Sequence, residues 1–325
     1  MKKILILAIG LLICCQAICC QVVLAAPQAT QFTFKFYPNQ PLNYNCKINM
    51  KAEMNLEVAG QKIPMKTDMI MSLNIRLLPE ADAIGKYTVV KMETSNIQVD
   101  YDIKAGGSHI IMKLRGSEVY ATQDGQVFID TQRNIGLADA QSIKDEVAAI
   151  YLSGKFEIDP QGRIGQILGD MPFVEFWSDI NQYGGLLGIT FPEKEIAVGD
   201  QWQESFKMTK MAEVLLKEPG LESVVTFTRK PDVIVGGKDL SVFSISAPIH
   251  QKNLAGYLDQ AGQRIELRIP SITRTATGTV HFDPEGRMVD YAVQVDGKTV
   301  MNFTAEGQDV RGEVKLNMKA EMKLL

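Results

Sequence analysis

Beyond its N-terminus the chain is nearly free of cysteine, which limits how it can be stabilised. Four of its five cysteines lie between residues 14 and 20, and Cys46 is the one that follows them. A single cysteine cannot form an intrachain disulfide, so the folded part depends on its apolar core. Cys46 alternates in phase with Ile48 and Met50, and we therefore expect a buried small hydrophobic side chain rather than a nucleophile.

The sequence also lacks the residue patterns of common enzymes. Its three histidines stand at no metal-ligand spacing with one another or with an acidic cluster. It contains no Gly-x-Ser-x-Gly, no glycine-rich phosphate loop and no His-Glu-x-x-His. Asp100 and Asp102 flank Tyr101, but two carboxylates without a glycine-bearing loop are more typical of a solvated face than of a Ca²⁺ site. We expect a non-enzymatic protein without metal or cofactor, and a hydrolase is the least favoured function.

Positive charge is not in excess. The formal net charge is −4, and removing residues 1–25, which carry Lys2 and Lys3 and no acidic residue, lowers it by 2 to −6. This mild acidity argues against a nucleic-acid partner, because binding to phosphates requires a basic surface. No segment after residue 25 approaches the ~20 apolar residues that span a bilayer.

The N-terminal segment has the pattern of an export signal. Lys2 and Lys3 precede an apolar run over residues 4–18, and Val23-Leu24-Ala25 supplies the residues that a signal peptidase reads. We predict a signal peptide over residues 1–25 and export to the periplasm, the cell surface or the medium. An uncleaved segment would instead anchor the protein in the membrane. Lipidation is less favoured, because isoleucine or cysteine precedes each cysteine of the segment.

One ten-residue stretch occurs twice, at residues 47–56 and again at residues 315–324. Eight of the ten positions are identical, and in both copies apolar and polar residues alternate. Strict alternation predicts a strand with one face toward an apolar core and the other toward water. Two arrangements stay open: the last strand neighbours the first, or each half of the chain uses such a strand at a different place.

Long alternating segments joined by tight turns predict a mainly β protein. Strands of about fifteen residues are expected over 42–58 and 63–77, and since most strands have five or six residues they imply long, curved antiparallel sheets. Asp124-Gly125 and Asp296-Gly297 are each expected to form a tight hairpin turn. Residues 250–262 are expected to be a polar loop or a short helix.

Two turn patterns recur in the same order and indicate an internal duplication. A Gly-Lys hairpin occurs at residues 84–86 and 236–238, and an Asp-Pro-x-Gly-Arg turn at residues 159–163 and 283–287. Asp, Pro and Gly at these places are typical of a type I turn. We therefore assign the Asp and Arg of each copy to a turn with a nearby salt bridge, and not to an acid–base pair.

Helical periodicity is confined to the first part of the chain. Apolar residues fall on one face over residues 139–152 and again over residues 172–183. The expected fold is accordingly α+β and mainly β, with one or two helices packed on the first half. We divide the chain after the signal into two β-rich halves, residues 26–195 and residues 196–325.

Methionine is plentiful on the apolar faces of the predicted strands. The chain has 15 methionines, and the flexible methionine side chain is common at apolar surfaces that bind varied partners. Filling of the core is the simpler explanation, and binding of a lipid or another hydrophobic small molecule by a curved sheet is the functional one. The candidate ligand-facing residues are Met50, Met54, Met65, Met69, Met71, Phe173 and Trp177.

A pattern near the middle of the chain resembles a known family. Pro192 and Val198-Gly199-Asp200-x-Trp202, after an aromatic-rich predicted helix and the first Asp-Pro turn, resemble secreted bacterial proteins of unknown function. The resemblance covers most of the chain after the signal, and it implies no catalytic residue. More loosely, a curved sheet with helices on its concave side is similar to periplasmic lipoprotein carriers, which hold acyl chains there.

The sequence supports two candidate functions. The first is an exported protein of the cell envelope that binds a hydrophobic ligand in a curved sheet. The second is a structural or assembly module that binds another envelope protein through an edge strand. Residues 310–325 motivate the second, because an alternating strand at the end of the chain could pair at an edge of its own sheet or of a partner.

Overall fold

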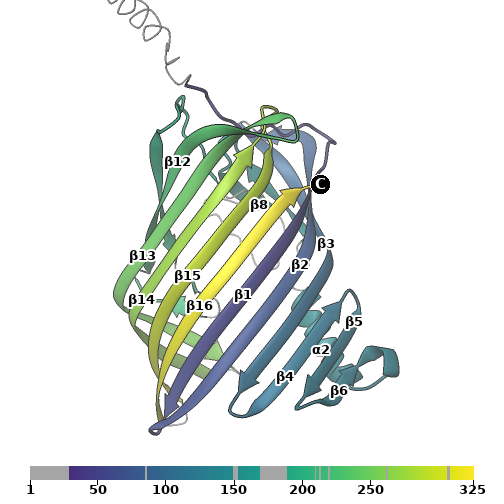
Figure 1. The fold of residues 1–325 in the computed structure, drawn as a ribbon, viewed down its shortest axis with the longest axis vertical. Coiled ribbons are helices and arrows are strands. Elements are labelled where there is room, and N and C mark those ends of the chain that lie inside the picture. Colours follow the sequence, from purple (N-terminus) through teal and green to yellow (C-terminus); the bar gives the residue numbers. More distant parts are fainter. Residues whose placement is uncertain are drawn as a thin grey trace, which may run out of the picture.

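The chain folds mainly into one large, curved antiparallel sheet (Figure 1). The computed structural model describes residues 29–84, 86–148, 153–168, 189–208, 210–211, 214–218, 220–260, 263–305 and 308–325. The predicted signal peptide and the predicted helix at 172–183, with Phe173 and Trp177, lie outside these residues. The expectation of a mainly β fold with a long, curved sheet is confirmed.

Strands occupy most of the described chain. Those of the first half are β1 (Leu42–Val58), β2 (Gln61–Ile84), β3 (Tyr87–Ala105), β4 (Ser108–Arg115), β5 (Glu118–Gln123), β6 (Gln126–Asp130), β7 (Ser153–Ile158) and β8 (Ile164–Leu168). Those of the second half are β9 (Gln201–Met208), β10 (Lys210–Met211), β11 (Val214–Leu216), β12 (Leu221–Val235), β13 (Lys238–Gln260), β14 (Gln263–Phe282), β15 (Met288–Ala305) and β16 (Gln308–Leu324).

The last strand lies beside the first, in the middle of the sheet. The strand order is β10-β11-β13-β14-β15-β16-β1-β2-β3-β4-β5-β6, with β16 antiparallel to both β15 and β1. The two copies of the repeated stretch are therefore direct partners, and Met50 stands opposite Met318. The expectation that residues 310–325 offer an edge to a partner is wrong, because both sides of β16 are already paired.

The sheet divides at two long strands, each of which changes partner along its length. β3 pairs with β7 over residues 88–93 and with β4 over residues 98–105. Between them Asn96 has a φ of 54°, a left-handed conformation that asparagine tolerates better than most residues. β13 pairs with β12 near its start and with β11 near its end, and Asn253, with a φ of 59°, lies between these ladders. In β3 the register with β2 shifts at this point, so a bulge bends the strand between its two partners. In β13 Asn253 is left unpaired without a shift in register.

Two expectations about local structure are wrong. Residues 250–260 belong to β13 and not to a loop; Asn253 is skipped in the pairing with β14, which shifts the alternation and hides the strand in the sequence. Asp296-Gly297 lies within β15 and not in a hairpin. A Cβ atom at Gly297 would stand 2.6 Å from the Cγ of Arg274, so this glycine allows a close packing contact.

Helical structure is limited among the described residues. A 3-10 turn, η1 (Thr131–Arg133), precedes α2 (Leu137–Ala148), which confirms most of the helix expected at 139–152. Asp130 caps η1 by accepting hydrogen bonds from the backbone N–H groups of Gln132 and Arg133. In the part of the chain that the structure describes, no helix has the length and apolar character needed to cross a bilayer.

The recurring turns occupy matching places in the two halves. β3, which follows the first Gly-Lys hairpin, pairs with β7, which leads into the turn at Asp159. In the same way β13 follows the second hairpin and pairs with β14, which leads into the turn at Asp283. The matching topology agrees with a duplication, which stays a prediction, as does the boundary between residues 195 and 196. Each turn closes as expected, with Gly162 and Gly286 donating to the carbonyls of Asp159 and Asp283.

Candidate functional site

The inner face of the sheet, whose side chains meet in the main apolar core, carries the candidate site. Residues that stand opposite each other in neighbouring strands form rows of side chains in contact. One such row crosses five adjacent strands and is nearly all methionine. It consists of Met112 (β4), Tyr101 (β3), Met69 (β2), Met50 (β1) and Met318 (β16).

The five candidate methionines of the described chain lie on this face, as their alternation predicted. Met71 stands opposite Ile48, and Met65 stands opposite Met54. Met71 thus lies in the row next to the methionine row on one side, and Met54 and Met65 lie two rows away on the other side. Tyr101 and Met112 were not among the candidates from the sequence, although their alternation with Asp100 and Lys113 was an available signal.

Burial of the inner face changes along the strands. Near the start of β1 it is complete, with Tyr44, Leu73 and Leu77 all buried. Two to three rows further on, Met50 and Met69 are half-buried. The candidate residues therefore belong to the part of the inner face that the described chain covers incompletely. Apolar surface left in this state gains free energy when another apolar group covers it, by roughly 25 cal/mol per Å².

An aromatic cluster fills the fully buried end. It consists of Phe32, Phe34, Phe191, Trp202, Phe227, Phe243 and Phe282. The centroid of the Phe191 ring lies 5.0–6.3 Å from those of five other members, in tilted, stacked and edge-on arrangements. Such arrangements suit the ring quadrupoles. The cluster joins the lead-in residues 29–36 to strands of the second half and fixes the curvature of the sheet at this end.

The residues of the Val198–Trp202 pattern hold this cluster in place. Asp200 accepts a hydrogen bond at Oδ2 from the N–H of Ala197, and Gly199 takes a φ of 96° in the turn between them. The indole N–H of Trp202 donates to the carbonyl of Thr190 at 2.8 Å. Arg229 is buried, with its guanidinium carbon 5.1 Å from the centroid of Phe32. In the described structure the pattern has a structural role.

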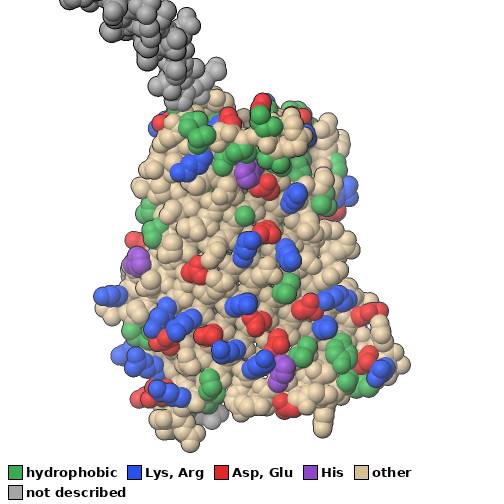
Figure 2. Space-filling view, in the orientation of Figure 1, with side chains coloured by type: hydrophobic (Ala, Val, Ile, Leu, Met, Phe, Trp, Pro, Cys, Tyr) green, Lys and Arg blue, Asp and Glu red, His purple; other side chains and the backbone are tan. Residues whose placement is uncertain are grey.

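The outer face of the same strands is polar. On β1 it presents Lys47, Asn49, Lys51, Glu53 and Asn55. Ion pairs join neighbouring strands there, such as that between Lys66 Nζ and Glu53 Oε1 at 2.9 Å. Figure 2 shows positive and negative side chains interspersed over the lower half of this surface. The sheet therefore separates a charged, hydrated side from an apolar inner side.

One cation lies on the inner face among the apolar rows. Arg274 of β14 stands opposite Gly297, in the row that also holds Leu316 and Ala52. Its Nη2 lies 3.4 Å from the hydroxyl of Thr299, a buried residue of β15. The pair brings a polar group to the edge of the methionine-rich zone. Neither Arg274 nor Thr299 was among the candidates from the sequence.

The raised pKa values of Cys46 and Tyr44 reflect the low polarity of the inner face. Burial raises the pKa of the Cys46 thiol from about 9 to about 11. Burial also raises the pKa of the Tyr44 phenol, whose O–H donates to the carbonyl of Met288. Because Cys46 favours its neutral form when folded, its contribution to stability is complete below the unfolded pKa and is lost as pH rises toward 11.

We expect Cys46 to resist alkylation by iodoacetamide at pH 8 as long as the protein is folded. Only the thiolate reacts, and a pKa near 11 leaves on the order of one thiol in a thousand ionised at that pH. Peptide mapping by mass spectrometry reads this residue separately from the N-terminal cysteines, and protein unfolded in urea is the control. Equal labelling with and without urea would contradict the burial of Cys46.

The two carboxylates considered as metal ligands already have side-chain partners. Asp100 accepts two hydrogen bonds of 2.7 Å from Arg115, and Asp102 lies 2.9 Å from His109 Nε2, all on the outer face. Within the described ranges, no group of three or more His, Cys, Asp or Glu side chains is placed to hold a metal ion.

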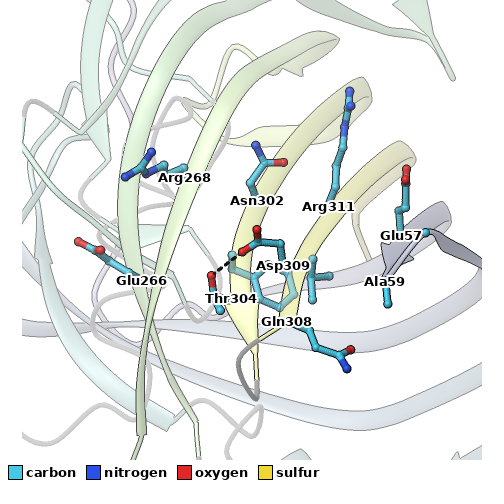
Figure 3. Close-up of a pocket in the computed structure, with 12 residues that line it drawn as sticks. Glu57, Ala59, Glu266, Arg268, Asn302, Thr304, Gln308, Asp309 and Arg311 are labelled. Atoms are coloured by element: carbon cyan, nitrogen blue, oxygen red, sulfur yellow. Dashed lines mark hydrogen bonds between the residues drawn. The ribbon is translucent and has the colours of Figure 1, made fainter.

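A polar groove of about 990 Å³ lies at the other end of the sheet (Figure 3). One row across four strands supplies Arg268, Asn302, Arg311 and Glu57, and Thr304 donates to Asp309 beside them at 3.0 Å. Acidic and basic groups are mixed in its lining. None of the candidate methionines contributes to this groove.

Comparisons with known proteins give distant structural likenesses. No protein-family model matches the chain, and no curated protein matches it. The chain resembles a solved structure titled "Lipid-protein interactions in lipovitellin", with 9% identity and a TM-score of 0.45 over 90% of this chain and 25% of that one. This chain therefore spans about a quarter of the length of the lipovitellin chain.

Two bacterial structures are more distant. The translocator domain of the autotransporter NalP from Neisseria meningitidis has 10% identity and a TM-score of 0.19, over 88% of this chain and 89% of that one. The outer membrane protease OmpT from Escherichia coli has 8% identity and a TM-score of 0.24, over 90% and 99%. Likenesses at this level carry no argument about function, and the resemblance built on the Val198–Trp202 pattern stays a prediction.

Proposed function

We propose that this protein is an exported, non-enzymatic protein of the cell envelope that binds the acyl chain of a lipid against the inner face of its sheet. The observation that carries the proposal is the half-buried zone around the methionine row, which is continuous over five strands. Ligand pockets are mostly apolar with a few placed polar groups. Methionine suits acyl chains of varied length, since its unbranched thioether adapts its shape.

The polarity of the zone favours an amphiphilic ligand over a plain hydrocarbon. Arg274 lies on the inner face one row beyond the row of Met50, and Thr299 lies in the row after that. A guanidinium group pairs well with a carboxylate or phosphate, through charge-assisted hydrogen bonds. The ligand class that suits both features is a fatty acid or phospholipid, with its chain on the methionines and its acidic group toward Arg274.

We expect lipid to co-purify with the protein and to be displaced by an apolar dye. Native mass spectrometry of protein from an exporting host should show bound species in the mass range of lipids. The double variant Met69→Gln/Met318→Gln should bind the dye about tenfold more weakly, because an amide must be desolvated where a thioether was covered, at a cost of about 1–3 kcal/mol.

Ile70→Gln is the matched control for this double variant. Ile70 follows Met69 in β2 but points to the outer face, with 48% of its surface exposed. Its replacement should leave dye and lipid binding unchanged. The proposal fails if no lipid co-purifies and if all three proteins bind the dye equally.

A further inference from the structure

The tip of the β12–β13 hairpin exposes three consecutive apolar side chains. Val233, Ile234 and Val235 are 38%, 75% and 55% exposed. The turn itself is Gly236-Gly237, both with positive φ, which gives a tight two-residue connection. A strand that covers a core is apolar at every second residue, so three in succession place apolar groups on both faces of the hairpin. The inner core accounts for at most one of these faces.

The tip lies at the end of the molecule where the described chain begins. Thr30 pairs with Ile196 there, Lys35 donates to Gly286, and Leu325 donates to Asn43. Tyr37, Val198 and Leu325 are further exposed apolar side chains at this end. Figure 2 shows hydrophobic side chains gathered along it, whereas charged side chains dominate the lower half.

We propose that residues 233–235 form a membrane-docking tip that inserts into the interfacial region of a phospholipid bilayer. The tip is a two-stranded ribbon in which Val233, Ile234 and Val235 stand opposite Leu240, Asp239 and Lys238, and the interfacial region still holds water for the backbone groups on its outer sides. Exposed Lys230 and Asp232 lie just behind the apolar residues and oppose deeper entry, while exposed Asp239 and Lys238 flank Ile234 and Val235 on the partner strand. Apolar side chains flanked by charged ones are the arrangement of a shallow membrane anchor.

The chain around the tip favours a lipid surface over strand addition by another protein. Among the described residues β12 pairs with β9 up to Thr228 and Arg229 bonds to the backbone of Gly199 and Asp200, so residues 230–235 form an edge. Pro231 has no N–H to donate, and the register shifts between Lys230 and Val233. A proline and a bulge protect an edge against pairing with a further strand. What remains available is the apolar side-chain surface.

Tryptophan placed at the tip tests insertion directly. The full chain with Ile234→Trp is mixed with phosphatidylcholine vesicles that carry brominated acyl chains. We expect a blue shift of the added emission and quenching by the bromines, while Ile70→Trp on the outer face of β2 shows neither change. The readout is local, so it does not depend on whether the N-terminal segment also binds the vesicles. Unquenched emission from Ile234→Trp at lipid excess would overturn the proposal.

Loss of the tip tests its contribution to affinity. Ile234→Asp/Val235→Asp should weaken co-sedimentation with phosphatidylcholine vesicles about tenfold or more, and added salt should have little effect on the parent, because apolar burial is not screened. Equal binding of parent and variant would contradict the proposal. So would a parent dimer, seen without vesicles, that the variant converts to a monomer while vesicle binding persists. These outcomes are independent of ligand binding at the inner face, which the Met69→Gln/Met318→Gln variant measures.

Discussion

A chain truncated after Arg311 should fail to fold. The deletion of residues 312–325 removes most of β16, which pairs along its length with β15 on one side and β1 on the other. Loss of an edge strand removes one ladder of backbone hydrogen bonds. Loss of β16 removes two such ladders and separates the strands of the first half from those of the second. The buried side chain of Met322 is lost from the core as well. Far-UV circular dichroism during a thermal melt measures the outcome.

Removal of Leu325 alone is the control for this truncation. Leu325 is exposed, and its N–H donates to the carbonyl of Asn43 at the end of the ladder. Its loss should cost about one hydrogen bond, or roughly 0.5–1.5 kcal/mol. A cooperative melt of the 312–325 deletion within a few degrees of the parent would show that β16 is not a central strand in solution.

The faces of the strands could be predicted from the sequence, but not their partners. Residues 42–58 were expected as a strand and form β1 with the same bounds, because strict alternation has a period that no other element shares. Alternation states which side chains are inside; it does not state which strand lies alongside. The pairing of β1 with β16 therefore stayed open, although the repeated stretch pointed to both strands.

The candidate site was predictable to the same extent. The inward direction of Met50 and Met69 follows from alternation alone. Their contact with Tyr101 depends on β3 continuing past Asp100 and Asp102, and acidic residues usually mark the end of a strand. The strand continues because Arg115 of β4 pairs with Asp100 and His109 of β4 lies within hydrogen-bond distance of Asp102 on the outer face. That information lies in a neighbouring strand and not in the local sequence.

Valine at Gly162 or Gly286 should destabilise the fold strongly. Their φ angles are +87° and +83°, a region that β-branched residues avoid at a cost of about 1–3 kcal/mol. Neither site has room for a side chain. A Cβ at Gly162 would lie 2.5 Å from Cε2 of Phe34, and one at Gly286 would lie 2.9 Å from the carbonyl oxygen of Thr33.

The lead-in segment makes both sites sensitive. Phe34 donates to the carbonyl of Pro160 at 2.7 Å, and Lys35 donates to that of Gly286 at 2.9 Å, so residues 33–35 bridge the two turns. A valine in either turn displaces this bridge and, with it, part of the aromatic cluster. Overpacking of this kind adds about 1–3 kcal/mol. The total is a large share of a typical stability of about 5–15 kcal/mol.

Asparagine at Asp159 or Asp283 is the comparison that separates a turn from a catalytic pair. Asp159 Oδ1 accepts from the N–H groups of Gln161 and Arg163, and the amide oxygen of asparagine can accept both. Asp283 also binds the guanidinium of Arg287 at 2.7 Å, so its variant should lose about 1–3 kcal/mol. Thermal melts of the four variants should therefore place both valine changes well below both asparagine changes. Small and equal Tm shifts for all four variants would contradict the structural role of the turns. An unchanged Tm together with loss of ligand binding in the asparagine variants would assign these aspartates to function.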